Sequence, residues 1–212
     1  MTPIKAVAFA VAVASVTSWV VVAADPGQSN RAYAMAAGTT TATSTATASP
    51  TATTRPCNVV PHSFRPRTIT MPHITRHAKV VTPPRVSRRV PGAPPLTAAG
   101  KEMFAYDLKQ GIAPGDPHGH VLLNAHVWPD GSAVGNRMLA KLHKGDRVVV
   151  FGKYLKLCYR VVKRVTVLAS VGLPGYYTKT GPPRLAFVTC SGKRLGPGRW
   201  TKRTVWYAAP MV

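Results

Sequence analysis

The stretch LAFVTCSGKRLGPGRWTKRTVWYA, residues 185–208, contains two apolar segments separated by a loop of glycine, proline and basic residues. Both segments have the β-branched and aromatic content of buried strands. The Gly-Pro-Gly sequence between them is typical of a turn. We therefore expect two neighbouring antiparallel strands, with Cys190 at the end of the first. The position raises the question of what a thiol does at a strand end.

Further short apolar segments, separated by turn residues, continue this pattern through most of the C-terminal part of the chain. Strands are predicted in the ranges 120–126, 147–152, 155–167, 184–190 and 204–208, and two more in 67–81 around a proline-containing bend. Many short strands with glycine and proline between them favour an all-β fold with a closed or nearly closed barrel.

Two of these segments also show which residues share a face. In 155–167, alternate residues predict one half-buried strand face: Leu157, Tyr159, Val161, Val165 and Val167. In 134–143, apolar residues at helical spacing predict a short helix: Val134, Met138, Leu139 and Leu142.

The N-terminal part of the chain has a different composition. Residues 6–24 contain no charge and predict an export signal in 1–25, long enough at about 1.5 Å per residue to approach a bilayer core. We favour a retained, single-pass signal anchor over a cleaved signal with secretion. Residues 26–61 form a linker whose Thr/Ala-rich part predicts a disordered tether. The folded domain is expected in 62–212, outside the cytoplasm.

The chain is strongly basic, with 28 Lys and Arg against 6 Asp and Glu. This charge favours a polyanion as a neighbour. Export and the lack of a recognition motif argue against nucleic acid. The basic, proline-rich residues in 55–95 are expected to be extended and solvated, apart from the strands in 67–81.

Three cysteines leave at least one unpaired thiol in an oxidising compartment. Cys158 has two interpretations, a disulfide with Cys57 or a small core side chain. Cys190 is a candidate nucleophile, which needs a basic or cationic neighbour and, once activated, would have a depressed pKa. His126 ends the apolar segment before it, and Arg203 begins the strand predicted beside Cys190.

Four segments together resemble those of sortases, the cysteine transpeptidases of Gram-positive-type cell surfaces. They are ITMPHITRHAKVV (69–81), VLLNAHVW (121–128), FVTC (187–190) and GRWTKRTVWYA (198–208). The resemblance covers about residues 68–208 and is greatest to the class E and F branch. It implies a closed barrel of about eight strands with short helices, preceded by the apolar helix and the tether. The usual Thr-Leu-x-Thr-Cys motif reads Ala-Phe-Val-Thr-Cys here.

The resemblance also implies the site. Its catalytic residues correspond to Cys190, His126 and Arg203, with Arg199 as a rival basic residue. Residues implied in substrate binding are Thr189 and, from the loop before the 184–190 strand, Leu173, Tyr176 and Tyr177. That loop, 168–183, contains no carboxylate for the calcium site of some relatives, and the histidine pairs 73/77 and 118/120 lack further ligands. No metal and no cofactor is predicted.

The implied reaction is cleavage of an LPXTG-like sorting signal through a thioester. The acyl group then passes to an amine of a cell-wall precursor or a pilin. The protein is expected to be a monomer and to reach the membrane through its N-terminal segment. An alternative remains open, in which the chain is a catalytically inactive, surface-anchored β-barrel that binds polyanions.

Overall fold

The computed structural model describes residues 57, 60–173 and 175–211. All of them belong to one compact unit, Ala52–Val212. The predicted export signal in 1–25 and nearly all of the linker in 26–61 lie outside the described residues. Within the part that the structure describes, no helix has the length and apolar character needed to cross a bilayer.

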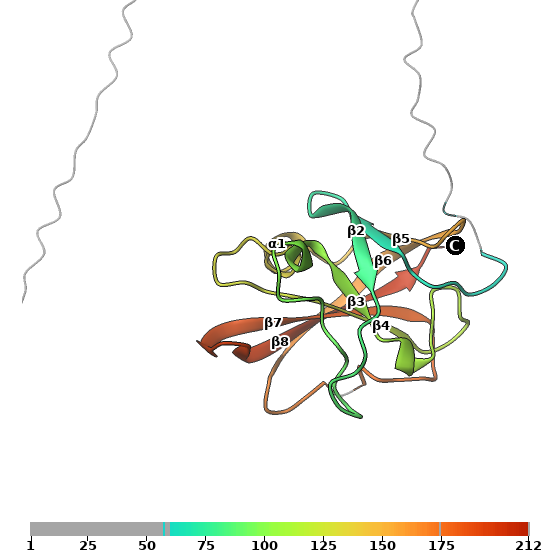
Figure 1. Ribbon diagram of the computed structural model, residues 1–212. Coiled ribbons are helices and arrows are strands. Elements are labelled where there is room, and N and C mark those ends of the chain that lie inside the picture. The colour runs from blue at the N-terminus through green and yellow to red at the C-terminus, as the bar shows by residue number, and fades with distance from the viewer. Residues whose placement is uncertain (1–56, 58–59, 174, 212) are drawn as a thin grey trace, which may run out of the picture. The chain divides into compact units, whose positions relative to one another are not determined.

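The described residues form a closed barrel of eight strands (Figure 1), which confirms the predicted all-β fold. The strands are β1 (Thr68–Met71), β2 (Thr75–Val81), β3 (Phe104–Tyr106), β4 (His120–Ala125), β5 (Arg147–Phe151), β6 (Lys156–Leu168), β7 (Arg184–Gly196) and β8 (Arg199–Pro210). The helices are α1 (Val134–Lys141) and the 3-10 helices η1 (Ala99–Glu102) and η2 (Leu108–Gln110). Around the barrel the strand order is β1-β2-β3-β4-β7-β8-β6-β5.

Two pairs of neighbours, β2–β3 and β4–β7, are parallel, and the other pairs are antiparallel. The parallel β4–β7 pair matters most for the site. Because both strands run in the same direction, the residues directly beyond their last pair, Ala125 with Thr189, lie at the same edge of the paired stretch.

The sequence did not predict β3 and predicted β7 and β8 too short. β3 has three residues, fewer than a periodicity argument needs. β7 and β8 continue through polar residues, to Gly196 and from Arg199, as a hairpin. Thr189 is the last β7 residue that pairs with β4, but the pairing of β7 with β8 continues beyond it. The hairpin therefore extends beyond the barrel (Figure 1).

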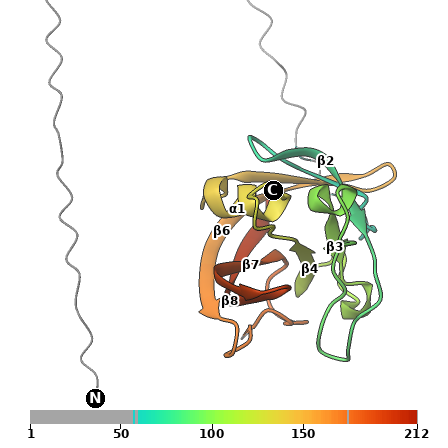
Figure 2. The ribbon, with the colours of Figure 1, turned by 60° about the vertical axis from the view of Figure 1, so that its left-hand side comes forward.

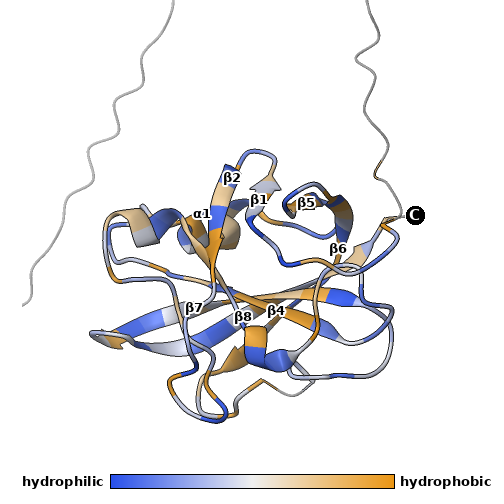
Figure 3. Ribbon diagram, turned by 45° about the vertical axis from the view of Figure 1, so that its right-hand side comes forward, coloured by the Kyte–Doolittle hydropathy of each residue, from blue (hydrophilic) through white to orange (hydrophobic). Residues whose placement is uncertain are grey.

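The barrel interior holds the main hydrophobic core. Its largest side chains with no exposed surface include Ile69, Met71, Phe104, Leu123, Phe187 and Trp206. The Trp206 indole N–H donates to the carbonyl of Leu142 at 3.0 Å, so the one polar atom of this ring is satisfied. Figure 3 shows apolar residues on the central strands and hydrophilic residues on much of the connecting chain.

The predicted single face of β6 is wrong, because the strand contains a bulge. The register against β8 shifts between Val161 and Lys163. Residues up to Val161 alternate into the barrel core. An extra residue in one strand reverses the alternation, so Val165 and Val167 face the other way, beside Val205 and Arg203 of β8. The bulge therefore moves two valines to the outer face of the sheet.

Cys158 is both buried and bridged, because it forms a disulfide with Cys57 across 101 residues of sequence. The bond ties the segment before β1 to β6. Val60 and Phe64 of that segment pack on the barrel core. The closed barrel, its core and the disulfide all lie within residues 57–211.

We predict that the double substitution Cys57→Ser/Cys158→Ser lowers the free energy of unfolding by about 2–5 kcal/mol, because it removes a constraint on a long loop of the unfolded chain. Urea unfolding under oxidising conditions measures the effect. Cys190→Ser is the matched control, since Cys190 forms no disulfide. Equal stability of the double variant and the parent would contradict the stabilising role of this bond.

Candidate active site

His126 directly follows β4, and Cys190 lies within β7, one residue past the last β7 residue that pairs with β4. The two strands pair in parallel without interruption up to Ala125 opposite Thr189. His126 and Cys190 are the next residues along the chain. Neighbouring strands are about 4.8 Å apart, so the register brings the imidazole and the thiol to adjacent positions at one edge.

Arg203 completes the row, because it pairs directly with Cys190 across the antiparallel β7–β8 ladder. Directly paired residues point to the same side of a sheet. Figure 2 shows β4, β7 and β8 next to one another. Arg199 instead pairs with Gly196 at the hairpin turn, four residues and about 13 Å further along the strand. Of the two arginines, the structure brings Arg203 to Cys190.

The side of the sheet that carries this row lies outside the barrel core. A second apolar cluster covers it, formed by Leu122, Tyr176, Ala186 and Val205, with Leu173, Val188 and Tyr207 packed against them. Residues of this cluster come from β4, β7, β8 and the β6–β7 loop, residues 169–183. The row of His126, Cys190 and Arg203 therefore lies next to an apolar surface that is partly covered by the β6–β7 loop.

The β2–β3 connection, residues 82–98, forms the other wall. His126 Nε2 lies 2.6 Å from the carbonyl oxygen of Pro94. A carbonyl oxygen only accepts, so this contact requires the proton on Nε2 and leaves Nδ1 available to a neighbour. Two residues earlier, and therefore on the same face, Asn124 donates to the carbonyl of Gly92 at 2.8 Å.

The sequence predicts that the basic, proline-rich residues of the β2–β3 connection are solvated. This prediction is wrong where the connection contacts the barrel. Gly92 and Pro94 are buried. Arg85 donates to both carboxylate oxygens of the buried Asp107, at 2.6–3.0 Å. A bidentate arginine is a strong and directional anchor. The connection has no regular structure over most of its length, yet polar contacts hold it against β4.

Helix α1 supports His126 from the backbone side. The N–H of Gly135 donates to the His126 carbonyl at 3.1 Å. A Cβ at position 135 would lie 2.2 Å from that oxygen and 2.6 Å from the Thr189 hydroxyl. The close approach requires glycine, and it fixes the chain where β4 ends.

The thiol of Cys190 is partly buried, and burial raises its pKa while the positive charge of Arg203 opposes the rise. The depressed pKa expected of an activated thiol is therefore not what the structure gives. The Arg203 guanidinium donates to the carbonyls of Trp200 and Lys202, at 3.2 and 2.9 Å. These contacts hold the cation beside the hairpin backbone.

The four residues predicted to bind substrate lie in two different environments. Thr189 is buried on the face opposite Cys190, where it donates to the Ala125 carbonyl at 3.0 Å. Tyr176 has no exposed surface and donates to the Leu123 carbonyl at 3.2 Å. Leu173 is half-buried and Tyr177 is exposed. Only Leu173 and Tyr177 offer surface to a ligand.

Tyr177 also joins the two walls, because its hydroxyl donates to the Arg89 carbonyl at 3.0 Å. The β6–β7 loop and the β2–β3 connection therefore meet at this point. The sequence did not identify Gly92, Pro94 or Asn124 as part of the site. Two of these contribute backbone carbonyls, for which no side-chain pattern exists.

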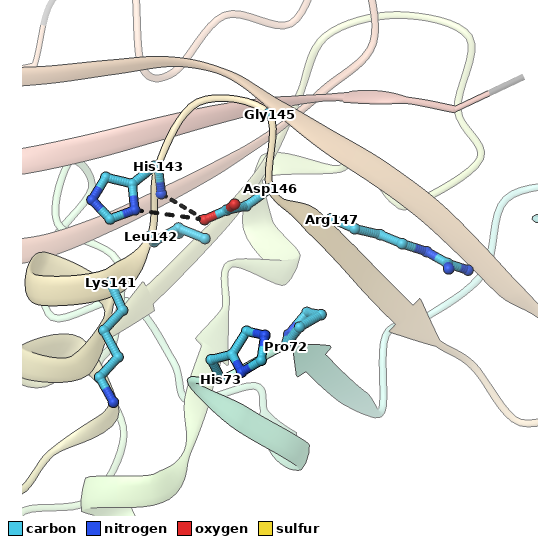
Figure 4. A pocket seen from close by; sticks show the side chains of 8 residues that line it. All are labelled: Pro72, His73, Lys141, Leu142, His143, Gly145, Asp146 and Arg147. Atoms are coloured by element: carbon cyan, nitrogen blue, oxygen red, sulfur yellow. Dashed lines mark hydrogen bonds and ion pairs between the residues drawn. The ribbon is translucent and has the colours of Figure 1, made fainter.

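A separate cavity of about 430 Å³ lies between the β1–β2 turn and the α1–β5 loop (Figure 4). It contains none of the residues predicted for the site. Lys141 and Arg147, which line it, extend in different directions (Figure 4). Among the described residues, no group of three or more His, Cys, Asp or Glu side chains is arranged to hold a metal ion.

No family model matches the sequence, and no curated protein matches it. Solved structures do match the fold. Sortase C1 of Streptococcus agalactiae, in a complex with MTSET, has a TM-score of 0.52 at 16% identity over 68% of this chain and 66% of that one. The chain has the sortase fold.

Two further sortases share it. Sortase C2 of Group B Streptococcus Pilus Island 1 has a TM-score of 0.50 at 16% identity, over 73% of this chain and 77% of that one. Sortase C-1 of Actinomyces oris has a TM-score of 0.50 at 18% identity, over 68% and 71%. This chain spans just under two thirds of S. agalactiae sortase C1. At these identities the likeness concerns the sortase fold alone.

We predict that alkylation of Cys190 by iodoacetamide accelerates with pH around a midpoint above that of free cysteine, because burial disfavours the thiolate. Arg203→Gln moves the midpoint still higher, since the charge that favours the thiolate is lost. Arg199→Gln, which removes a hairpin cation away from the thiol, leaves it unchanged. A parent midpoint below that of free cysteine would refute this assignment of burial as the dominant effect.

Proposed function

We propose that this chain is an extracytoplasmic sortase, a cysteine transpeptidase that cleaves an LPXTG-like sorting signal and transfers the acyl part to an amine. The observation that carries the proposal is the row of His126, Cys190 and Arg203 on one face of three adjacent strands. A thiol, a base and a cation at neighbouring positions are the groups that nucleophilic acyl transfer needs.

In the first step, Nδ1 of neutral His126 takes the proton from Cys190. The thiolate attacks the carbonyl carbon of the Thr in the sorting signal, which forms a C–S bond and an oxyanion. Arg203 stabilises the negative charge as it develops on oxygen. The raised pKa of Cys190 keeps the thiol protonated in the resting protein, so the thiolate forms when substrate is in place.

Collapse of the oxyanion breaks the C–N bond of the scissile peptide. The departing amine takes the proton from the imidazolium of His126, and a thioester on Cys190 remains. An amine of a cell-wall precursor or a pilin then attacks the thioester carbonyl and gives its proton to neutral His126. The C–S bond breaks, the Cys190 sulfur takes the proton back from the imidazolium of His126, and the transpeptidation product leaves. Water in place of the amine gives slow hydrolysis.

Pro94 would serve as a positioning group in this mechanism. Its carbonyl accepts from Nε2 and so fixes the tautomer in which Nδ1 is free for proton transfer. The contacts of Asn124 and Arg85 hold the connection that carries this carbonyl. We propose that the β2–β3 connection takes the orienting role that a third side chain has in other cysteine hydrolases.

The apolar surface beside the row supports binding of the Leu-Pro part of a sorting signal, with Leu173 and Tyr177 at its rim. Thr189 and Tyr176, which are buried, would shape this surface from behind. The motif residues in 187–190 and 198–208 support assignment to a class E or F type of sortase.

A location outside the cytoplasm is part of the proposal. The Cys57–Cys158 disulfide supports it, because disulfides persist in oxidising compartments. The uncharged residues 6–24 support attachment to the membrane through a retained signal anchor.

The competing function, a polyanion-binding barrel without catalysis, is favoured by one observation, the excess of basic residues. It gives no account of the row of His126, Cys190 and Arg203. Substitution of Cys190 separates the two functions, since polyanion binding does not need a thiol.

We predict that Cys190→Ala abolishes the acyl-enzyme formed with LPXTG-like or LAXTG-like peptides. Intact-mass spectrometry of the full chain, incubated with these peptides and an amine acceptor, measures the adduct. Arg203→Gln is expected to lower kcat/KM by about 10²–10³-fold, as for loss of an oxyanion donor, and Arg199→Gln to leave it nearly unchanged. Transfer at the parent rate by Cys190→Ala would exclude the mechanism.

We predict that Arg85→Ala loosens the β2–β3 connection and lowers kcat/KM by about 10²-fold, the scale of a small misplacement of a reacting group. Long-range ¹⁵N NMR on His126 is expected to show the Nε2–H tautomer in the parent and a mixture in the variant. Arg88→Ala is the matched control, because Arg88 is exposed and takes part in this contact through its backbone carbonyl, which accepts from Arg85.

Gly92→Ala tests the same idea without removing a charge, since its Cβ would lie 2.3 Å from the Pro84 carbonyl and must displace the connection. Thermal unfolding verifies that each variant is folded. A parent-like tautomer in both folded variants would refute the positioning role of Pro94.

A further inference from the structure

Charge is distributed unevenly around the barrel. After Asp146 the sequence contains no Asp or Glu, while residues 147–212 contain thirteen Lys and Arg. This segment forms β5, β6, β7 and β8, and these strands are consecutive in the barrel order. The sequence asymmetry therefore becomes a spatial one, with a continuous half of the barrel wall that has cations and no carboxylate.

The carboxylates of the described residues neutralise other parts of the molecule. Three form ion pairs with basic side chains, namely Asp107 with Arg85, Asp130 with Lys101 and Glu102 with Arg137. Asp146 lies beside His143, and Asp116 accepts from the Ala113 N–H. Within the part of the chain that the structure describes, no Lys or Arg after Asp146 forms an ion pair.

The cations reach furthest from the barrel on the β7–β8 hairpin. Exposed basic residues occupy both of its strands: Lys193, Arg194, Arg199 and Lys202. Figure 3 shows hydrophilic colours along the projecting part of β7 and β8. β4 pairs with β7 only as far as Thr189. Among the described residues, no strand pairs with β7 beyond that point on the side away from β8.

Exposed aliphatic side chains accompany these cations. Leu195 at the hairpin end is 55% exposed, and Leu168 and Val171 at the end of β6 are 54% and 63% exposed. Leu168 pairs with Lys202, and the Ala169 N–H donates to the Thr201 carbonyl at 2.9 Å. The end of β6 and the hairpin therefore lie next to each other, and both have exposed basic or aliphatic side chains.

We name this the hairpin surface, formed by Leu168, Val171, Lys193, Arg194, Leu195, Arg199 and Lys202. We propose that the hairpin surface binds an anionic phospholipid bilayer. The cations contact lipid phosphates, and the three aliphatic side chains enter the boundary between headgroups and acyl chains. A soluble polyanion would use the cations alone and would leave the aliphatic groups in water, which is why a lipid surface fits better.

This contact differs from attachment by the N-terminal segment, because the folded domain itself lies on the bilayer. Cys190 and Arg203 are adjacent to the base of the hairpin. A docked hairpin would therefore hold the row of His126, Cys190 and Arg203 close to the membrane surface. The proposal does not depend on the proposed catalytic function, since it concerns equilibrium binding.

The test uses residues 52–212, which contain the closed barrel, its core and the disulfide, and lack the apolar segment 6–24. Co-sedimentation with vesicles measures binding to phosphatidylcholine alone and to phosphatidylcholine mixed with phosphatidylglycerol. We expect binding to the mixed vesicles that weakens with salt, and little to the neutral ones.

The triple variant Lys193→Gln/Arg194→Gln/Arg199→Gln is expected to weaken binding on the order of 100-fold, at about fivefold per surface cation. The matched control Arg76→Gln/Lys79→Gln/Arg88→Gln removes the same charge from exposed residues of β2 and the β2–β3 connection. It is expected to retain most of the binding. Equal loss in both triple variants would refute a defined surface and indicate attraction by net charge.

Leu195→Ser separates a bilayer from a soluble polyanion. It is expected to weaken vesicle binding severalfold and to leave binding of inorganic polyphosphate unchanged. Thermal unfolding of each variant verifies the fold. If Leu195→Ser binds vesicles like the parent while polyphosphate competes fully, the hairpin surface recognises polyanions and the lipid proposal is wrong.

Discussion

The parallel pairing of β4 with β7 is the constraint on which the rest of the site depends. Its register brings His126 and Cys190, separated by more than sixty positions in sequence, to adjacent positions just past the last pair of the ladder. The antiparallel β7–β8 ladder then adds Arg203 beside Cys190. Because the barrel is closed, a strand cannot slip by one residue without moving apolar side chains out of the core. The stability of the core therefore also fixes the geometry of the row.

The two walls of the site are irregular chain, yet they are held by specific contacts. The β2–β3 connection rests on the ion pair of Arg85 with buried Asp107 and on the carbonyls of Gly92 and Pro94. Glycine at position 135 lets helix α1 approach the end of β4. The bulge in β6 adds Val165 and Val167 to the outer face of the sheet. Each device acts on the face or edge that carries His126 and Cys190.

Strands with a long and regular alternation of apolar residues could be predicted from the sequence. Features that depend on a short segment or on distant segments could not. Three residues of β3 are too few to show alternation, and the bulge in β6 interrupts an alternation that looks continuous. The polar part of the hairpin lacks an apolar face, so its pairing depends on cross-strand hydrogen bonds that no local pattern reports. The proline-rich connection resembles solvated chain because its contacts run through backbone carbonyls.

The sequence by itself determined the class of fold, the large excess of basic over acidic residues, and the residue types available for acyl transfer. These follow from local composition and from the period of apolar residues. Only the tertiary structure decided that Arg203 pairs directly with Cys190, that Thr189 and Tyr176 are buried, and that burial raises the pKa of the thiol. Register, burial and the approach of backbone carbonyls arise between distant segments, so they exist only once the barrel has closed.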